Sequence, residues 1–342
     1  MAAPTDDAAI DRHIAELFAF DLDAQIETIT SRIRELLRAQ LRRRGLVIGI
    51  SGGIDSSVCT ALAVRAVGPD KVFGLLMPER DSSSSSVTLG KLIVEQFGID
   101  HAIEDIAPTL EAIGCYRWRD QAMQAVFPEY RPGWKSKIAI GGGGSGGFNH
   151  FRLIVQDEAG AQHEQRLPLQ EYLQIVAATN FKQRIRKTLE FFHADRLNYA
   201  VVGTPNRLEY DQGFFVKNGD GSADLKPIAH LYKSQVYMLA RRLGIPESIC
   251  NSAPSTDTYS LQQGQDEFYF ALPYKAMDIA LWHHNQGLPA QSLAQRLGID
   301  VTRAQIVYQD IENKRRTTAP LHWPALLVSK VTGPQTRAPE SQ

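Results

Sequence analysis

The chain has 342 residues, of which 43% are hydrophobic and 22% are charged, and its formal net charge at pH 7 is −1. This composition is ordinary for a globular protein and is sufficient for one large hydrophobic core or two smaller ones. The near-neutral charge does not favour a nucleic-acid-binding surface, and no apolar run reaches the roughly 18 residues of a membrane-spanning helix. Three isolated cysteines and an N-terminus without a signal pattern predict a cytoplasmic protein.

The first third of the chain alternates predicted helices and strands. Apolar residues spaced three and four apart predict helices, and short apolar runs predict buried strands. In chain order, these elements are helices within 8–43, a strand at 46–50, a helix at 55–67, a strand at 72–76, a helix at 85–99 and a strand at 101–106. The alternation predicts an α/β fold with a doubly wound parallel sheet flanked by helices.

The alternation resumes after a less regular middle. The later elements are a helix at 180–197, a strand at 198–204 and a helix at 234–246. Residues 121–177 are expected to be an insertion, in which the alternation at 151–169 predicts a hairpin turning at Ala-Gly. The glycine run 141–147 is expected to be a mobile loop or a disordered connector. We expect a single domain over 1–342, with N-terminal helices in 1–45, the insertion at 121–177, and C-terminal helices and a tail in 271–342.

The stretch "SGGIDSS" at 51–57 follows a predicted strand and opens a helix. Glycine-rich turns in this position bind phosphate through backbone N–H groups and the positive end of the helix dipole. The stretch lacks the lysine of a G-x-x-x-x-G-K-[ST] loop and contains Asp55 instead, so a Mg²⁺ ion is expected between this carboxylate and bound phosphates. The alternative is a plain strand-to-helix turn in which an aspartate or a serine is the N-cap. The candidate phosphate-binding residues are Gly49, Ser51, Gly52, Gly53, Asp55, Ser56 and Ser57.

This loop resembles the pyrophosphate loop of the N-type ATP pyrophosphatases, whose fold is adenine nucleotide alpha hydrolase-like. The resemblance implies that ATP is cleaved between its α and β phosphates and that an acceptor is adenylated. It does not identify the acceptor.

The stretch "GTPNRLEYDQGFFVKNGDGSADLKPIAHLYKSQ" at 203–235 resembles the NAD synthetases within that group. The resemblance implies that Thr204 contacts ATP and that Glu209 binds Mg²⁺ together with Asp55. It also implies that Lys233 reaches the ATP phosphates, where a cation would stabilise the leaving pyrophosphate. Two further residues are implied to contact deamido-NAD, namely Lys217 and Asp224, and Asp224 is a candidate for the base that keeps ammonia unprotonated.

The stretch "NFKQRIRKTLEFF" at 180–192 places Asn180, Arg184 and Lys187 on one helix face, with Lys182 and Arg186 in a neighbouring row. It resembles the NAD synthetase helix whose arginine meets the nicotinate-bearing substrate, which makes Asn180 and Arg184 substrate candidates. The alternative is a charged face that is exposed to solvent.

Three weaker resemblances complete the candidate site. Met77, at the end of a predicted strand, stands in a segment similar to the one around the adenosine of ATP. Ser255 occupies a position where threonine is usual in the family, and an ATP contact is implied. Lys314 matches the family's basic C-terminal tail and is implied to contact the substrate.

The resemblance implies an ammonia-dependent NAD synthetase that amidates deamido-NAD with ATP and Mg²⁺ and releases AMP and pyrophosphate. The family also implies a homodimer, and the first 45 residues are too few for a glutaminase domain. Three alternatives remain open. The first is a related ligase for another carboxylic acid, suggested by the unusual segment 121–177. The others are a tRNA-thiolating enzyme and a nucleotide-binding regulator, the latter because 288–316 faintly resembles a helix-turn-helix motif.

Overall fold

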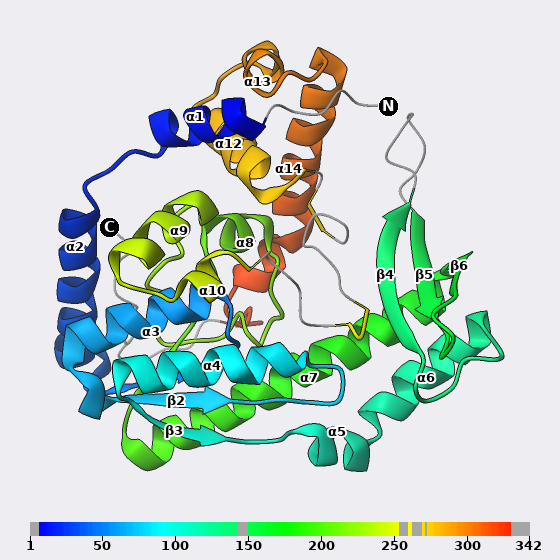
Figure 1. The fold of residues 1–342 in the computed structure, drawn as a ribbon, viewed down its shortest axis with the longest axis horizontal. Helices are drawn as coiled ribbons and strands as arrows, with labels where there is room; N and C mark the ends of the chain where they lie inside the picture. The colour runs from blue at the N-terminus through cyan, green and yellow to red at the C-terminus, as the bar shows by residue number, and fades with distance from the viewer. Residues whose placement is uncertain (1–6, 142–149, 253–258, 262–268, 271, 330–342) are drawn as a thin grey trace.

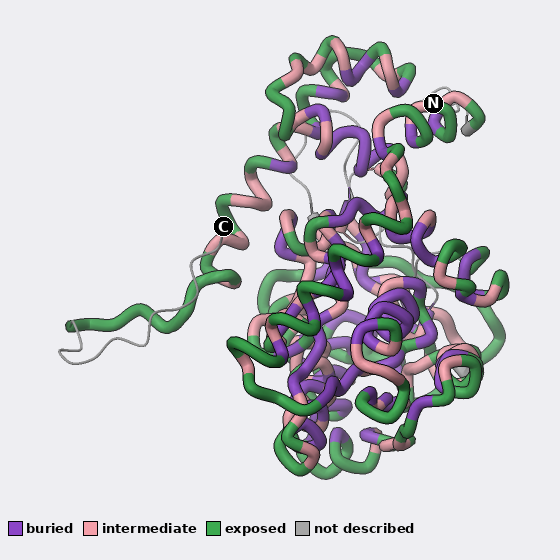
Figure 2. Tube along the Cα trace, turned by 90° about the vertical axis from the view of Figure 1, so that its left-hand side faces the viewer, coloured by how far each residue is buried: buried purple, intermediate pink, exposed green. Residues whose placement is uncertain are grey.

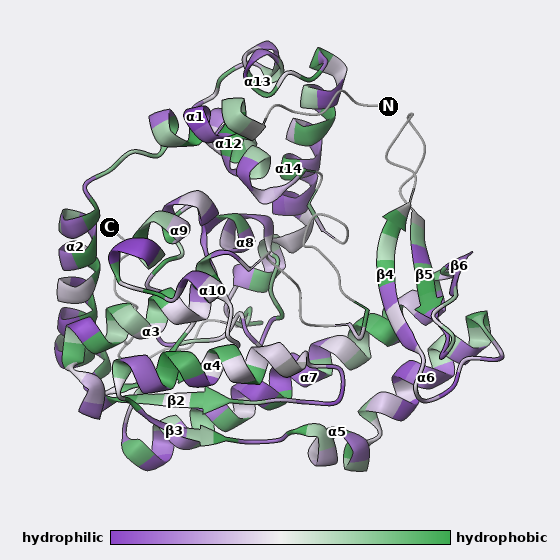
Figure 3. Ribbon diagram, in the orientation of Figure 1, coloured by the Kyte–Doolittle hydropathy of each residue, from purple (hydrophilic) through white to green (hydrophobic). Residues whose placement is uncertain are grey.

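The computed structural model of the chain describes residues 7–141, 150–252, 259–261, 269–270 and 272–329 (Figure 1). Within these residues, four parallel strands form a sheet in the order β3 (Asp100–Ile103), β2 (Val72–Leu76), β1 (Leu46–Gly49) and β7 (Ala200–Val202). The predicted doubly wound parallel sheet is therefore confirmed. Figure 3 shows β2 in the green of hydrophobic residues, as expected for a strand covered on both faces.

Helices cover both faces of the sheet, and the alternation of side chains along β1 explains why. Leu46 and Ile48 point into a core shared with α2, α3 and α9, whereas Val47 points into a second core shared with α5, α6 and α7. The helices of the first half are α1 (Asp7–Leu17), α2 (Leu22–Glu35), a π-helical turn η1 (Leu36–Leu41), α3 (Ile54–Val67), a 3₁₀ turn η2 (Pro69–Lys71), α4 (Ser84–Phe97), α5 (Ala107–Ile113) and α6 (Cys115–Val126). Those of the second half are α7 (Leu169–Leu197), α8 (Arg207–Gln212), α9 (Lys233–Arg242), α10 (Glu247–Cys250), α12 (Tyr274–Asn285), α13 (Ala290–Leu297) and α14 (Val301–His322).

The segment 121–177 contains a small antiparallel sheet of its own. Its described strands are β4 (Lys135–Gly141), β5 (His150–Gln156) and β6 (Gln162–Arg166), in that order. The predicted hairpin is confirmed, with its turn at Asp157–Ala161 and Gly160 at a φ of +87°. Most of the glycine run 141–147 lies outside the described residues.

Helix α7 connects this small antiparallel sheet to the parallel sheet. It begins at Leu169, before the predicted start at residue 180. The additional turns are stabilised by tertiary packing, because Ile175 is buried in the core formed with the small antiparallel sheet while Ala194 is buried against the parallel sheet. The long helix thus places one continuous set of side chains between the two sheets.

The terminal helices pack on one another at one end of the molecule. The helical prediction for 8–43 is divided in the structure, because α1 ends at Leu17 and packs with α12, α13 and α14, whereas α2 packs against α3. The apolar residues Leu293, Val307 and Ile311 of α13 and α14 are fully buried in the same core. The faces that resemble a helix-turn-helix motif are therefore used for internal packing. Figure 2 shows the exposed residues after α14 extending away from the body. None of the described helices combines the length and the low charge that crossing a bilayer requires.

Candidate active site

A cavity of about 1640 Å³ opens at the carboxyl edge of the parallel sheet. Strand β1 lies between β2 and β7, so the next strands in the chain, β2 and β3, are added on one side of β1 and the later strand β7 on the other. Ligands of such sheets bind beyond the carboxyl ends of the strands, where the strand order reverses. The loop after β1 and Thr204 after β7 both line the cavity, which is the position that this rule predicts.

The glycine-rich loop joins β1 to the N-terminus of α3 and forms one wall of the cavity. Gly52 has a φ of +78°, and a Cβ atom there would lie 2.7 Å from the carbonyl oxygen of Ser86, so the position requires glycine. Gly53 is the N-cap residue of α3, and no side-chain hydrogen bond caps this described helix. The alternative in which Asp55 or a serine is the N-cap is therefore wrong, and the positive end of the α3 dipole faces the cavity.

The serines of the loop hydrogen-bond to the loop itself. Ser56 Oγ and Ser57 Oγ donate to the carbonyl oxygen of Gly53 over 3.0 and 2.8 Å. Ser51 Oγ accepts the N–H of Gly53 over 3.2 Å. Ser57 is fully buried, and it is not among the described residues that line the cavity. The predicted residues of this loop that do line the cavity are Gly49, Ser51, Gly52, Gly53, Asp55 and Ser56.

Asp55 meets a buried lysine at the base of the loop. The Nζ atom of Lys233 forms a short ion pair with Asp55 Oδ2, and Asn206 Nδ2 donates to Asp55 Oδ1 over 3.2 Å. Burial acts to lower the pKa of Lys233, but the charges of Asp55 and Glu209 outweigh this effect and raise the pKa above its usual value. Lys233 is therefore a fixed cation on the cavity wall.

Asp55 and Glu209 are suited to hold one divalent cation together. Both line the cavity, and both charges contribute to the raised pKa of the buried Cys59 thiol, after burial itself. In the described parts of the chain, no group of three or more His, Cys, Asp and Glu residues could hold a metal. Mg²⁺ commonly binds one or two carboxylates and takes its other oxygens from phosphates and water. The donor set thus fits Mg²⁺ bound jointly with a polyphosphate.

The charged residues of α7 form two rows with different partners. Lys182 Nζ forms ion pairs with acidic residues of the segment after β2, and Arg186 Nε donates to the carbonyl oxygen of Met77 over 3.2 Å. Lys187 Nζ pairs with Glu190 Oε2 at 2.6 Å, and Asn180 also lines the cavity. Because Lys182 and Lys187 are both buried, the alternative of a solvated charged face is wrong for these two residues.

Three predicted substrate contacts, Arg184, Lys217 and Asp224, are not part of the cavity wall. Arg184 Nε donates to the carbonyl oxygen of Lys217 over 3.3 Å, and Lys217 Nζ donates to the carbonyl oxygens of Pro320 and Trp323 over 2.8 and 3.1 Å. Asp224 Oδ2 accepts the backbone N–H of Val201 over 2.7 Å. The structure describes these three residues, and none of them lines the cavity. Their contacts with substrate stay predictions.

Two polar residues of the cavity region were missed by the sequence reasoning. Asp220, four residues before Asp224, lines the cavity, and burial raises the pKa of its carboxyl. The G-D-G sequence around Asp220 was the available signal. Asn206 N-caps α8 through a capping box, in which its side chain and that of Glu209 each accept the other's backbone N–H over 3.2 Å. The spacing N-x-x-E is the sequence signature of this motif.

The last three predicted site residues are Lys314, Met77 and Ser255. Lys314 of α14 lines the cavity, and its Nζ donates to the carbonyl oxygen of Tyr269 over 2.5 Å and to Asp310 Oδ2 over 2.6 Å. Burial lowers the pKa of Lys314, and the Asp310 charge opposes this effect. Met77 also lines the cavity, whereas Ser255 lies outside the described residues.

Comparisons with known proteins agree with this geometry. The model of the family described as NAD synthase matches residues 25–127 and 154–318. An NH3-dependent NAD+ synthetase of Rhizobium meliloti strain 1021 is 55% identical over 318 residues, which cover 93% of this chain and 95% of that protein. The chain belongs to the NAD synthase family. The family match omits residues 128–153, which lie within the predicted insertion.

Solved structures agree with the NAD synthase fold. The NMN synthetase of Francisella tularensis has a TM-score of 0.62 at 22% identity, over 90% of this chain and 99% of that chain. The NH3-dependent NAD synthetase of Campylobacter jejuni has a TM-score of 0.59 at 20% identity, over 91% of this chain and 100% of that chain. At these identities the likeness concerns the fold, and it confirms the predicted adenine nucleotide alpha hydrolase-like architecture.

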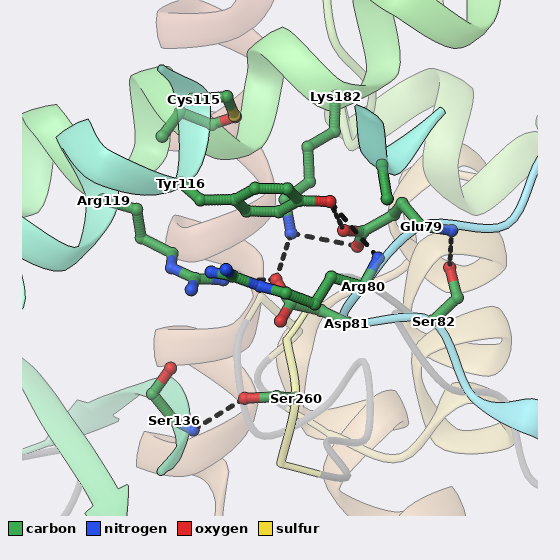
Figure 4. A network of polar contacts seen from close by, with 12 residues as sticks. Glu79, Arg80, Asp81, Ser82, Cys115, Tyr116, Arg119, Ser136, Lys182 and Ser260 are labelled. Atoms are coloured by element: carbon green, nitrogen blue, oxygen red, sulfur yellow. Dashed lines mark hydrogen bonds and ion pairs between the residues drawn. The ribbon is translucent and has the colours of Figure 1, made fainter. Parts of the chain in front are cut away.

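In this NAD synthase chain, a buried ionic network attaches the segment after β2 to α6 and α7 (Figure 4). Lys182 Nζ lies 3.0 Å from Glu79 Oε1 and 2.5 Å from Asp81 Oδ2, and Arg119 also pairs with Asp81. The hydroxyl of Tyr116 donates to Glu79 Oε2 over 2.7 Å. Burial acts to raise the pKa of Asp81, but the charges of Lys182 and Arg119 outweigh it and lower the pKa. The network therefore fixes the wall that includes Met77.

Removing the shared cation of this network should destabilise the fold. The Lys182→Met variant would leave Glu79 and Asp81 buried without their common partner, so we expect the free energy of unfolding to fall by about 3–5 kcal/mol. Urea denaturation of the variant and the wild type measures this loss. The control is Arg32→Met, which removes an exposed ion pair with Glu35 and should cost about 1 kcal/mol or less. Equal losses in the two variants would contradict the assignment.

Proposed function

We propose that the chain forms NAD from deamido-NAD and ammonia, while ATP is converted to AMP and pyrophosphate. The observation that carries this proposal is the arrangement of Asp55, Glu209 and Lys233 around a phosphate-type loop at the switch point of the sheet. The 55% identity to an NH3-dependent NAD+ synthetase supports the choice of acceptor and nitrogen donor. ATP, deamido-NAD and ammonia are then the small-molecule partners.

In the first step, a carboxylate oxygen of deamido-NAD attacks the α-phosphorus of ATP. A C(O)–O–P bond forms, and the bond between the α-phosphorus and the bridging oxygen breaks, so that the electron pair leaves with pyrophosphate. Asp55 and Glu209 would hold Mg²⁺, which neutralises phosphate charge when bound. Lys233 and the N-terminal amides of α3 stabilise the negative charge that develops on the leaving group.

In the second step, neutral ammonia attacks the acyl carbon of the adenylated acid. The C–N bond forms, the bond between the acyl carbon and the bridging oxygen breaks so that this oxygen and its electron pair leave with AMP, and one proton must leave the nitrogen. Asp224 is the base that the family resemblance implies. Asp220 is a second candidate on the same loop, because it lines the cavity and burial raises the pKa of its carboxyl, which favours proton uptake.

Free ammonia as donor has a consequence for the pH dependence of the reaction. Only the neutral form is a nucleophile, so at fixed total ammonium the rate should rise roughly tenfold per pH unit while ammonium is mostly protonated. Initial rates of NAD formation between neutral and alkaline pH test this. Turnover of the purified chain with glutamine alone, as fast as with ammonium, would contradict it.

The acceptor is tested with a panel of carboxylic acids in the presence of ATP and ammonium. We expect pyrophosphate release to depend on deamido-NAD and to be at least tenfold slower with nicotinate mononucleotide or unrelated carboxylates. The second candidate function is a ligase for another acid. It is favoured by one observation, namely that Lys135, Ile140 and Phe151 of the insertion line the cavity. Pyrophosphate release that another acid restores, and deamido-NAD does not, would support that alternative.

The same proposal includes a cytoplasmic location and a homodimer. All three cysteines are free and buried, which is consistent with a reducing compartment. The homodimer is implied by the family resemblance, and light scattering of the purified chain would test it.

A further inference from the structure

A buried carboxylate on α12 caps the helix that begins with Lys233. Asp278 is fully buried, and its Oδ2 accepts the backbone N–H and the Oγ–H of Ser234, each over 2.7 Å. Its Oδ1 accepts the backbone N–H of Lys233 over 3.3 Å. Lys233 and Ser234 are the first two residues of α9, so one side chain from another helix satisfies their backbone donors.

The position of this carboxylate has a physical reason. The first N–H groups of a helix have no partner within the helix, and the positive end of its dipole favours a nearby anion. Asp278 lies 45 residues beyond Lys233, and it provides the anion from an otherwise apolar stretch of α12, between the buried residues Met277 and Ile279. A buried carboxylate is unfavourable without such donors, which makes the contact specific for the start of α9.

We propose that Asp278 is a positioning residue for Lys233. Its hydrogen bonds fix the first turn of α9, and this turn holds the lysine whose Nζ pairs with Asp55 at the phosphate loop. Asp278 does not touch the cavity itself, so it acts on the reaction through Lys233. The inference rests on the proposed function only in assigning Lys233 to the ATP phosphates.

Burial raises the pKa of Asp278 to about 7, and the hydrogen bonds from Ser234 and Lys233 offset only part of this effect. The carboxylate is therefore ionised at the alkaline pH at which ammonia is an effective nucleophile. Because the raised pKa means that ionisation opposes folding, removing the charge in Asp278→Asn offsets part of the stability that is lost when an amide NH₂ group faces one of the donors of α9.

A double-mutant cycle of Asp278→Asn and Lys233→Met tests the proposal. We measure the dissociation constant of Mg·ATP by calorimetry and kcat for deamido-NAD-dependent pyrophosphate release. Asp278→Asn should lower kcat at least tenfold with the KM for ATP changed less than threefold, at a temperature at which its melting curve shows that it is folded. In the Lys233→Met background, the same substitution should lower kcat and weaken ATP binding by less than twofold, because the residue through which it acts is absent.

Two further variants keep the result interpretable. Asp21→Asn removes a carboxylate that caps α2 by accepting the N–H of Ala24 over 3.0 Å, and it should leave kcat unchanged. If Asp278→Asn does not fold, Ser234→Ala removes one of the three hydrogen bonds and should give a smaller loss with the same non-additivity. Losses that multiply in the double variant, or an Asp278→Asn kcat within twofold of wild type, would overturn the proposal. If deamido-NAD is the wrong acceptor, the wild type itself shows no deamido-NAD-dependent release, and the cycle is then measured with the acid that restores release.

Discussion

The Lys233→Met variant should lose pyrophosphate release by a factor of about 1000 or more while its fold is retained. Removing one preorganised donor from a site of developing negative charge costs about 10²–10³ in kcat. Here the loss should reach the upper end, because Lys233 is a buried, preorganised cation and the substitution also leaves Asp55 without its ion-pair partner. Stopped assays of acceptor-dependent pyrophosphate release measure the effect.

The control for this variant is another lysine that pairs with an aspartate. Lys275 Nζ lies 2.5 Å from Asp11 Oδ1 at the surface, far in sequence from the phosphate loop. Lys275→Met should leave kcat within twofold of wild type, because an exposed ion pair contributes little. A Lys233→Met variant that folds and retains a tenth of the wild-type kcat would place the pyrophosphate elsewhere.

Neutralising the proposed metal ligands should have the second largest effect. We expect Asp55→Asn to lower kcat at least about 100-fold and to raise the Mg²⁺ concentration needed for half-maximal rate, since a carboxylate binds Mg²⁺ more strongly than an amide does. Glu209→Gln should act in the same direction. Glutamine keeps the oxygen that accepts the Asn206 N–H in the capping box, so α8 should stay folded.

Titration of the rate with Mg²⁺ at saturating ATP separates the metal role from a general electrostatic one. The control is Asp23→Asn, which removes an exposed carboxylate paired with Arg242. This variant should keep the wild-type Mg²⁺ dependence. If Asp55→Asn loses activity but its Mg²⁺ dependence does not change, the carboxylate acts on Lys233 and is not a metal ligand.

The parts of the fold that could be predicted are those in which local pattern and tertiary environment agree. The apolar run of β2 is buried on both faces, and its predicted bounds match the structure. The hairpin at Gly160 follows from turn chemistry and alternation. Residues 169–179 of α7 and strand β4 were not predicted. They are stabilised mainly by the core of the insertion, in which Ile138 and Ile175 are buried, and no local pattern reveals that partner.

In the candidate site, too, some residues could be predicted from sequence motifs and one could not. Asp55, Glu209 and Lys233 were predicted as site residues from ordered motifs, and the structure brings these side chains together although 178 residues separate Asp55 from Lys233. Asp278 was missed because helix N-caps are sought immediately before the helix, whereas this one comes from a different helix. A lone aspartate within the apolar stretch "AMDIAL" was the available signal, since a carboxylate there is stable only with nearby donors.

The central claim is that the acceptor carboxylate is adenylated before it is amidated, and isotope transfer tests it most directly. Deamido-NAD labelled with ¹⁸O at both carboxylate oxygens is incubated with the chain, ATP and ammonium. The ¹⁸O content of AMP, pyrophosphate and NAD is then measured by mass spectrometry. Attack of the carboxylate on the α-phosphorus predicts that each AMP carries one labelled oxygen, that pyrophosphate carries none, and that NAD retains the other. Unlabelled AMP, or ADP and phosphate in place of AMP and pyrophosphate, would contradict the account.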